Sequence, residues 1–337
     1  MNPLIGLTAL ALGISWLADS RRGNASKVQK CFERFHERIR LSEDNQKAKL
    51  REKRQALLDD LRCNLGPTAP AFEWFNQGSY AMHTGIVPRD GDYDIDVGLV
   101  FDCARSAYSD PVALKVLVRD AMKRSARTVQ IRRSCVTAQY LRTGIPAYHV
   151  DLAVYVKRKD GLLDIAKGKE YSEPEYRRWE KADPKGLTRV LANRYSGEEL
   201  SQYRRCIRYM KRWRDLKFSA GAPVSIALTV AAYLWFEPRH QALGASPRDL
   251  DAMRDWTKAI LNRFSNETTR EGPHERLRIA LPVEPHVDLL AKLSKTQMGR
   301  LQAALASLHA SLHRATNATT LDDCKALLAE QFGTEFG

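Results

Sequence analysis

The chain has 337 residues, of which 44% are hydrophobic and 28% charged, so it is long enough for two domains and too apolar to be disordered. Lys and Arg number 54 against 40 Asp and Glu, and the formal net charge of +14 predicts anionic partners without saying whether they are nucleotides, nucleic acid or a membrane surface. The six cysteines are widely spaced and form no CxxC pair, which excludes a local zinc ribbon and favours free thiols in a reducing compartment.

Residues 1–22 form an apolar N-terminal segment. Eleven of the fifteen residues from Leu4 to Ala18 are Leu, Ile, Ala or Trp. The run is short for a membrane-spanning helix and lacks the basic start of a signal peptide. We therefore expect a helix that docks on the protein, and peripheral contact with a membrane is the alternative. The expected location is the cytoplasm.

Residues 23–165 predict a core of mixed helices and strands. A long, broken helix is expected over 25–65, where Gly66, Pro67 and Pro70 end the helical pattern. Alternation of apolar residues predicts a strand over 95–101, and the segments that follow predict a helix at 111–127 and strands at 129–140 and 148–156.

Residues 166–197 are polar and predict a connection between two lobes. Residues 198–331 predict a helical lobe, with helices at 198–216, 223–236, 247–264, 286–293, 295–315 and 320–331. Residues 332–337 predict a flexible tail. A mixed half followed by a helical half indicates the α+β class.

Three carboxylates are the main candidates for catalysis. Asp94 and Asp96 are two residues apart on a predicted strand, so both side chains project from one face and repel each other unless a cation lies between them. Asp151 lies on a later strand among apolar residues, where a carboxylate is costly without a partner. If the two strands are adjacent, the three carboxylates can hold two magnesium ions, with manganese as an alternative ion.

A second motif, Gln77-Gly78-Ser79, precedes the carboxylates. Glycine allows close approach of the backbone, and a serine hydroxyl with nearby amides can hold the triphosphate of a nucleotide. The order GS, DxD and a third Asp on an apolar strand is typical of phosphoryl transfer.

These residues, in the pattern QGSYAM … DID … HVD, resemble the nucleotidyltransferase superfamily of DNA polymerase β. Within it the sequence is most similar to the bacterial cGAS/DncV-like nucleotidyltransferases (CD-NTases) of CBASS anti-phage systems. The resemblance implies a polymerase β-like core, a mixed sheet with helices, followed by an α-helical C-terminal lobe. It implies that Asp94, Asp96 and Asp151 are catalytic and bind two magnesium ions, and that Gln77, Gly78 and Ser79 bind nucleotide.

The resemblance also implies a reaction and its partners. Nucleoside triphosphates such as ATP and GTP are joined with release of pyrophosphate, and a second round closes a cyclic di- or trinucleotide that acts as a second messenger on a downstream effector. A ubiquitin-transferase-like partner acting on the C-terminal Gly337 is expected in part of the family. The zinc insertion of animal cyclic GMP-AMP synthase has no counterpart here, so zinc-dependent DNA sensing is not expected. The protein is expected to be a monomer.

Two further residues are carried over from the family's phosphate-binding helices. Lys211, in the basic stretch 204–214, and Ser225 are candidates for contacts with the triphosphate. The alternative for Lys211 and its Arg neighbours is a solvated basic face.

Two other functions remain open from the sequence. One is a transferase of the same fold that acts on RNA ends or on a small acceptor. The other is a non-catalytic basic module that binds nucleic acid and whose carboxylates are structural.

Overall fold

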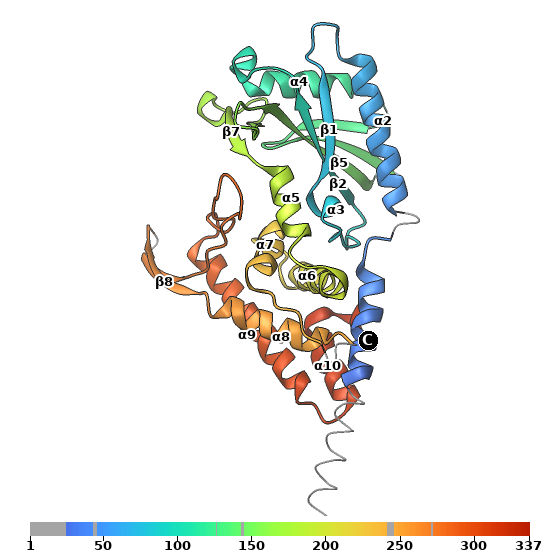
Figure 1. Cartoon of the computed structure of the whole chain (residues 1–337), viewed down its shortest axis with the longest axis vertical. Coiled ribbons are helices and arrows are strands. Elements are labelled where there is room, and N and C mark those ends of the chain that lie inside the picture. Colours follow the sequence, from blue (N-terminus) through green and yellow to red (C-terminus); the bar gives the residue numbers. More distant parts are fainter. Residues whose placement is uncertain (1–24, 43–45, 126, 143–144, 241–245, 271) are drawn as a thin grey trace, which may run out of the picture. The chain divides into compact units, whose positions relative to one another are not determined.

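The computed structural model describes residues 25–42, 46–125, 127–142, 145–240, 246–270 and 272–337, and it divides into two compact units (Figure 1). The helical unit comprises the residues up to 39 together with 195–279 and 290–337. The sheet unit comprises residues 40–194 and 280–289. Helices dominate one unit and a mixed sheet the other, which confirms the predicted α+β class. The predicted segment 1–22 lies outside the described residues.

One mixed sheet organises the sheet unit. Its order is β1-β2-β5-β4-β3, and β6 pairs with β5 and with β7. The pairing of β2 with β5 is parallel and the other pairings are antiparallel. The strands are β1 (Phe72–Gln77), β2 (Tyr93–Phe101), β3 (Arg127–Ile131), β4 (Val136–Arg142), β5 (Ile145–Lys157), β6 (Leu163–Lys167) and β7 (Arg178–Ala182).

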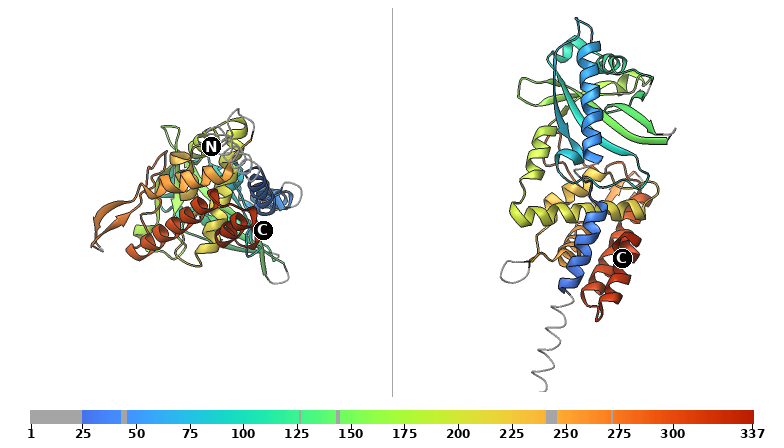
Figure 2. Two further views of the ribbon diagram at one scale, coloured as in Figure 1. Left: turned by 90° about the horizontal axis from the view of Figure 1, so that it is seen from below. Right: turned by 90° about the vertical axis from the view of Figure 1, so that its right-hand side faces the viewer.

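Two long helices cover one face of this sheet. Helix α2 (Ala48–Asn64), which lies in front of the sheet in the right-hand view of Figure 2, and α4 (Pro111–Ala121) contribute Leu57, Leu61, Leu114 and Val118 to the core. Alternate residues of the central strands meet them: Ile95, Val97 and Leu99 from β2, and Val150, Leu152 and Val154 from β5. Because strand side chains alternate between faces, the intervening residues of β2 and β5 project from the opposite face.

The structure corrects two predictions in this unit. The predicted strand over 129–140 is two strands, β3 and β4, because the polar residues 132–135 form a turn in which the Arg132 amide donates to the Cys135 carbonyl at 2.9 Å. The predicted connection over 166–197 contains β7 and helix α5 (Pro184–Ala192), which Asp183 caps by accepting from the Gly186 amide at 2.8 Å. Strand β7 is an edge strand, and an edge strand tolerates the polar sequence that favoured a connection.

The helical unit confirms most of the predicted helices. It contains helical residues 25–39, α6 (Gly197–Lys217), α7 (Ser225–Trp235), α8 (Asp249–Leu261), α9 (Lys295–Thr316) and α10 (Leu321–Phe332). The helix expected at 286–293 is wrong, because these residues form turns, with His286 at a positive φ of 54°. A hairpin of β8 (Ser265–Thr269) and β9 (Gly272–Arg276) was not predicted, since its residues are mostly polar.

Residues 332–337 pack onto the helical unit, so the prediction of a flexible tail is wrong. Phe332 and Phe336 are buried and lie against Phe32 and Phe35, with ring centroids 4.9 Å apart for Phe32 and Phe336. Arg38 donates to the carbonyl oxygens of Glu335 and Gly337 at 2.7 and 2.6 Å. Burial of two phenyl rings explains why the polar residues between them are held in place.

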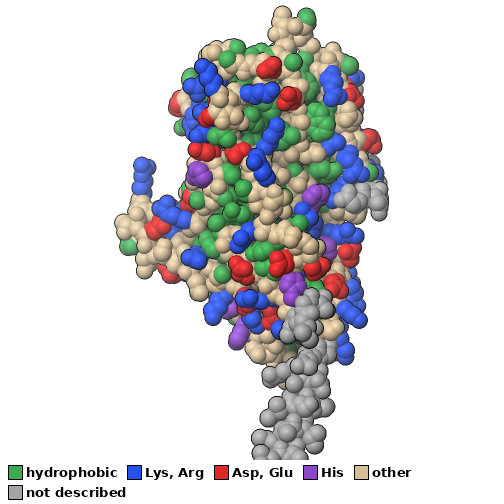
Figure 3. Space-filling view, viewed as in Figure 1, with side chains coloured by type: hydrophobic (Ala, Val, Ile, Leu, Met, Phe, Trp, Pro, Cys, Tyr) green, Lys and Arg blue, Asp and Glu red, His purple; other side chains and the backbone are tan. Residues whose placement is uncertain are grey.

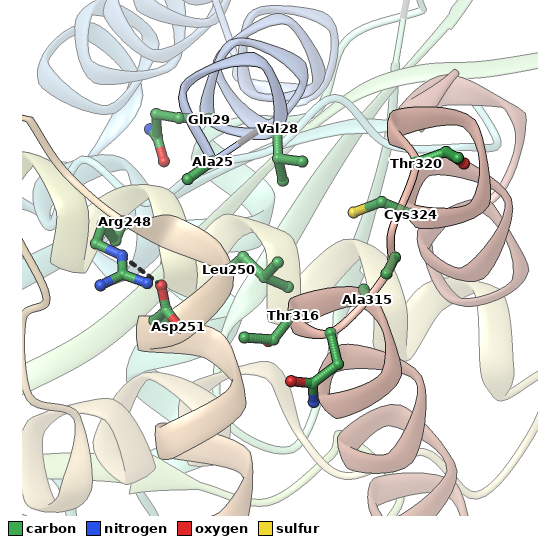
Figure 4. A pocket seen from close by; sticks show the side chains of 12 residues that line it. Ala25, Val28, Gln29, Arg248, Leu250, Asp251, Ala315, Thr316, Thr320 and Cys324 are labelled. Carbon is green, nitrogen blue, oxygen red and sulfur yellow. Dashed lines mark ion pairs between the residues drawn. The ribbon is translucent and has the colours of Figure 1, made fainter. Parts of the chain in front are cut away.

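Helix ends in the same unit surround a cavity of about 280 Å³ (Figure 4). Val28, Leu250 and Cys324 point into it, and an ion pair of 2.6 Å between Arg248 Nε and Asp251 Oδ2 lies at its side. All six cysteines of the chain are free thiols, as predicted. Over the described ranges, none of the helices combines the length and the apolar character needed to cross a membrane.

Candidate active site

Four polar side chains form one row across the centre of the sheet. Gln77 at the end of β1 pairs with Asp96 of β2, Asp96 pairs with Asp151 of β5, and Asp151 pairs with Thr137 of β4. These residues alternate with the core residues of their strands, so they lie on the face that α2 and α4 leave free. The parallel pairing of β2 with β5 thus brings together the two carboxylates that the sequence places 55 positions apart.

Asp94 completes the predicted set of carboxylates on this face. It is two residues before Asp96 on β2, where it pairs with His149 of β5. Asp94 is exposed, whereas Asp96 and Asp151 are half-buried. Like charges directly opposite each other on neighbouring strands are destabilising, so the pairing of Asp96 with Asp151 carries a cost that a bound cation would offset.

The donor set fits magnesium. Carboxylate oxygens on one face are the ligands this ion prefers, and it usually keeps several waters and substrate phosphates in its shell. Within the parts of the chain that the structure describes, no three His, Cys, Asp or Glu side chains are already gathered tightly enough to hold a metal ion on their own. The carboxylates would therefore hold the ion together with water and nucleotide, and their role as metal ligands stays a prediction.

Gly78 lies directly against one of these carboxylates. It starts the short helix α3 (Gly78–Ala81) with a positive φ of 64°. A Cβ atom at this position would lie 1.9 Å from Asp96 Oδ2, which is far inside the contact distance of the two atoms. Only glycine combines this backbone conformation with this close approach. The structure thus gives Gly78 a role beside Asp96 that the sequence did not predict.

The neighbours of Gly78 in the motif are held by the protein. Gln77 Oε1 accepts from the hydroxyl of Tyr155 at 3.0 Å, and Tyr155 projects from the same face of β5 as Asp151. Burial raises the pKa of this nearly inaccessible tyrosine, so its hydroxyl stays a donor. The Ser79 carbonyl accepts from the Thr84 amide at 2.9 Å, which fixes the turn after α3. Their binding of nucleotide stays a prediction.

Thr137 is a residue of the row that the sequence analysis missed. Its hydroxyl donates to Asp151 Oδ1 at 2.5 Å, and its side chain is almost fully buried. Cys135 Sγ lies 3.7 Å from the same hydroxyl oxygen, and burial raises the pKa of this thiol to about 12. The thiol is therefore neutral beside the carboxylate. Thr137 bonds to Oδ1 of Asp151, so Oδ2 is the carboxylate oxygen that Thr137 does not contact.

A second pair borders the site. His149 Nδ1 lies 3.0 Å from Asp92 Oδ1, and each side chain is about one-quarter exposed. Burial alone would lower the pKa of His149, but the hydrogen bond to Asp92 and the charges of Asp92, Asp151 and Asp94 raise the pKa overall. The pair connects the segment before Asp94 to the strand that carries Asp151.

Lys211 and Ser225 belong to the helical unit. Lys211 is buried on α6, and Ser225 is the first residue of α7. Their contacts with a triphosphate stay predictions. Part of the basic stretch 204–214 has a structural role, because Arg205 Nε donates to the buried Asp249 at 2.9 Å and Arg212 pairs with Glu335 at 3.0 Å.

A family model matches the part of the chain that contains this row. Residues 72–155, from the start of β1 to near the end of β5, match the nucleotidyltransferase domain of the family described as cyclic GMP-AMP synthase DncV-like. These residues belong to the DncV-like nucleotidyltransferase family. The match confirms the resemblance that the sequence motifs indicated, and it includes Gln77, Gly78, Ser79 and the three carboxylates.

Solved structures of CD-NTases share the fold of the chain beyond this DncV-like domain. CdnG of Bradyrhizobium diazoefficiens in complex with GTP has a TM-score of 0.70 at 16% identity, covering 91% of this chain and 95% of its own. CdnC of Escherichia coli MS115-1 in complex with HORMA-deltaN has a TM-score of 0.64 at 16% identity, with coverage of 92% and 98%. The Vibrio cholerae cyclic AMP-GMP synthase DncV with the linear intermediate 5′ pppA(3′,5′)pG has a TM-score of 0.56 at 16% identity, with coverage of 100% and 92%.

Proposed function

We propose that this protein is a nucleotidyltransferase that makes cyclic oligonucleotides from nucleoside triphosphates. The observation that carries the proposal is the row of Gln77, Asp96 and Asp151 across three neighbouring strands of a DncV-like domain. The fold shared with a cyclic AMP-GMP synthase that was solved with a linear intermediate supports it. The finer proposal is a cyclic di- or trinucleotide made from ATP- or GTP-type substrates, which acts as a second messenger in anti-phage defence in the cytoplasm.

In the proposed reaction a ribose hydroxyl oxygen bonds to the α-phosphorus of a nucleoside triphosphate, the bond from that phosphorus to the bridging oxygen breaks, and pyrophosphate leaves. Asp94, Asp96 and Asp151 would hold two magnesium ions, which supply positive charge next to the phosphates and lower the pKa of the hydroxyl. Asp151 accepts the hydroxyl proton, Thr137 holds Asp151 in place, and Gly78 keeps the backbone clear of Asp96.

The fate of labelled nucleotide separates this function from its alternatives. We expect that purified protein with magnesium and nucleoside triphosphates labelled at the α-phosphate releases pyrophosphate without any added acceptor, because a second nucleotide supplies the hydroxyl, and that adding RNA does not change where the label goes. Label found only on added RNA would instead identify an end-adding transferase. Absence of pyrophosphate release with every nucleotide, with magnesium or manganese, would contradict both enzymatic functions.

We expect Thr137→Val to lower kcat by about tenfold to a hundredfold while KM for nucleotide changes less than about threefold. The reason is that a hydrogen bond to a charged group, worth roughly 1.5–3 kcal/mol, is lost from Asp151, which acts in the chemical step. Steady-state pyrophosphate release measures both constants. Thr137→Ser keeps the hydroxyl and should restore most of kcat. Near wild-type activity in the Val variant together with a loss in the Ser variant would show that Thr137 acts only through packing.

For partners, the proposal includes a downstream effector that binds the cyclic product and a ubiquitin-transferase-like protein that acts at Gly337. In the structure the Gly337 carbonyl is bound by Arg38, and the preceding Phe336 is buried. A conjugating partner would therefore first have to release the segment 332–337 from the aromatic cluster around Phe32. CdnC, a protein of the same fold, is known in complex with HORMA-deltaN, so protein partners occur among proteins of this architecture.

A further inference from the structure

A groove on the sheet unit lies away from the row of carboxylates. One part, of about 470 Å³, lies between the second half of α4, strand β3 and the connection from β6 to β7, and a second part of about 240 Å³ continues it. The two parts share Lys169 and Ser172. Helix α4 packs on the face of the sheet opposite to Asp96 and Asp151, so this groove is separate from the candidate active site.

The walls of the groove are fixed by buried interactions. Lys115 of α4 is fully buried, and its ammonium group donates to the carbonyl oxygens of Arg132, Arg133 and Gly168, at 2.6 to 3.2 Å. Burial lowers the pKa of Lys115 to about 8. Arg177 holds the other end of the connection through Ser172 O at 2.7 Å and Asp110 Oδ2 at 3.0 Å. Two loops far apart in the sequence are therefore joined into one preformed surface.

The side chains that line the groove are predominantly cationic. They include one carboxylate, Glu170, and five cations, Arg119, Lys123, Arg133, Lys169 and Arg178. Arg119 pairs with Glu170, Lys123 with Asp120 and Arg178 with Glu180. For Arg133 and Lys169, no carboxylate partner is present among the residues that the structure describes. The groove therefore presents positive charge that the protein does not neutralise.

Two tyrosines in the same connection are exposed. Tyr171 is 91% exposed and Tyr176 is 57% exposed, although both are large and partly apolar side chains. Each lies within seven residues of Lys169, and both line the groove. Figure 3 shows that Lys, Arg, Asp and Glu side chains are spread over one face of the protein. The groove thus combines unneutralised cations with exposed aromatic rings on a fixed loop.

We propose that this groove binds single-stranded nucleic acid, with the phosphates at Arg133 and Lys169 and bases stacked on Tyr171 and Tyr176. Unneutralised cations attract the phosphate backbone, and exposed rings offer stacking surfaces for bases that are not already paired. An acidic protein segment would use the cations but not the exposed rings, which is why the observations favour nucleic acid over such a peptide. The proposal does not depend on the reaction proposed for the carboxylates.

Fluorescence anisotropy of the full chain with a labelled 12-nucleotide oligo(U) tests the proposal. EDTA in the buffer prevents turnover, and the Asp96→Asn variant should bind equally well because the groove is separate from the carboxylates. We expect the double variant Arg133→Glu with Lys169→Glu to weaken binding by at least about tenfold. We also expect the slope of log Kd against the logarithm of the salt concentration to fall by roughly 0.7 for each phosphate contact that is lost. We expect Tyr171→Ala to weaken binding by about tenfold and Tyr171→Phe by less than twofold.

The matched control is Lys49→Glu with Lys159→Glu, which makes the same change of charge at two exposed lysines outside the groove. Its binding should change less than threefold. Equal losses in this control and in the groove variant would overturn the proposal, since binding would then follow net charge alone. The proposal would also be overturned if the wild-type chain did not bind oligo(U). It would be overturned as well if an oligo-glutamate peptide bound more tightly than oligo(U) and its affinity were unchanged by Tyr171→Ala.

Discussion

Replacing Asp96 or Asp151 with Asn is expected to lower the rate of pyrophosphate release by about a thousandfold or more. Asn keeps the shape of the side chain but removes the charge that would hold magnesium and, at Asp151, the group that accepts the hydroxyl proton. The two carboxylates face each other across β2 and β5, so removing one charge relieves a repulsion. We therefore expect the thermal midpoint to stay the same or to rise slightly while activity is lost.

The matched control for these variants is Asp102→Asn. Asp102 is exposed immediately after the end of β2 and belongs to the same unit, but it is outside the row. Its activity should stay within about twofold of the wild type. An Asp96→Asn variant that keeps more than a tenth of the wild-type rate would refute the assignment of this carboxylate. If the carboxylates were structural, the Asn variants would lose thermal stability as well as activity.

The second large effect is expected for Gly78→Ala. The added methyl group would lie 1.9 Å from Asp96 Oδ2, so the carboxylate or the backbone of α3 has to move. The positive φ of Gly78 adds a cost of about 1–2 kcal/mol for a residue that has a Cβ atom. We expect activity to fall by about a hundredfold or more, because the displaced group is a proposed metal ligand, and we expect a lower thermal midpoint in differential scanning fluorimetry.

The Gly161→Ala variant separates the effect of backbone strain from the effect of contact with Asp96. Gly161 also has a positive φ, of 80°, but no atom lies within 4 Å of the position of an added Cβ. It should therefore show the loss of stability from backbone strain while activity stays within about twofold. If both variants lose activity to the same extent, contact with Asp96 is not the reason that position 78 requires glycine.

The alternation of the strands made part of the candidate site predictable. Asp94 and Asp96 are two residues apart in an apolar strand, and this spacing alone places them on one face. The pairing of Asp96 with Asp151 was conditional on β2 and β5 being neighbours, which depends on the order of strands in the sheet and not on any local pattern. The sequence alone does not determine which strands are neighbours, so it does not establish that Asp96 and Asp151 lie side by side.

Thr137 was missed for a related reason. A single strand over 129–140 contains no turn at 132–135. Without that turn β4 is not a separate strand, so its antiparallel pairing with β5, which places Thr137 opposite Asp151, is not predicted. The consecutive polar residues Arg132, Arg133 and Ser134 were the available signal for that turn.

The composition of residues 332–337 predicts a flexible tail, but the spacing of the aromatic residues at its start and end does not. Phe332 and Phe336 are four residues apart, a spacing that can place both rings on one side of a helical turn, where the structure buries them. The partners of these rings, Phe32 and Phe35, lie about 300 positions earlier, and no local pattern connects the two segments. Similarly, the helices that carry Lys211 and Ser225 were predicted well, but a phosphate contact depends on tertiary structure.

The most direct test of the central claim is mass spectrometry of the product made by the purified protein from magnesium and the four nucleoside triphosphates, after treatment with phosphatase. The account predicts a phosphatase-resistant product whose mass equals that of two or three nucleoside monophosphates less one water for each linkage, so that no terminal phosphate remains. The same product should be absent with Asp96→Asn. Products that are only linear, or unreacted nucleotides in the presence of magnesium and of manganese, would contradict the account.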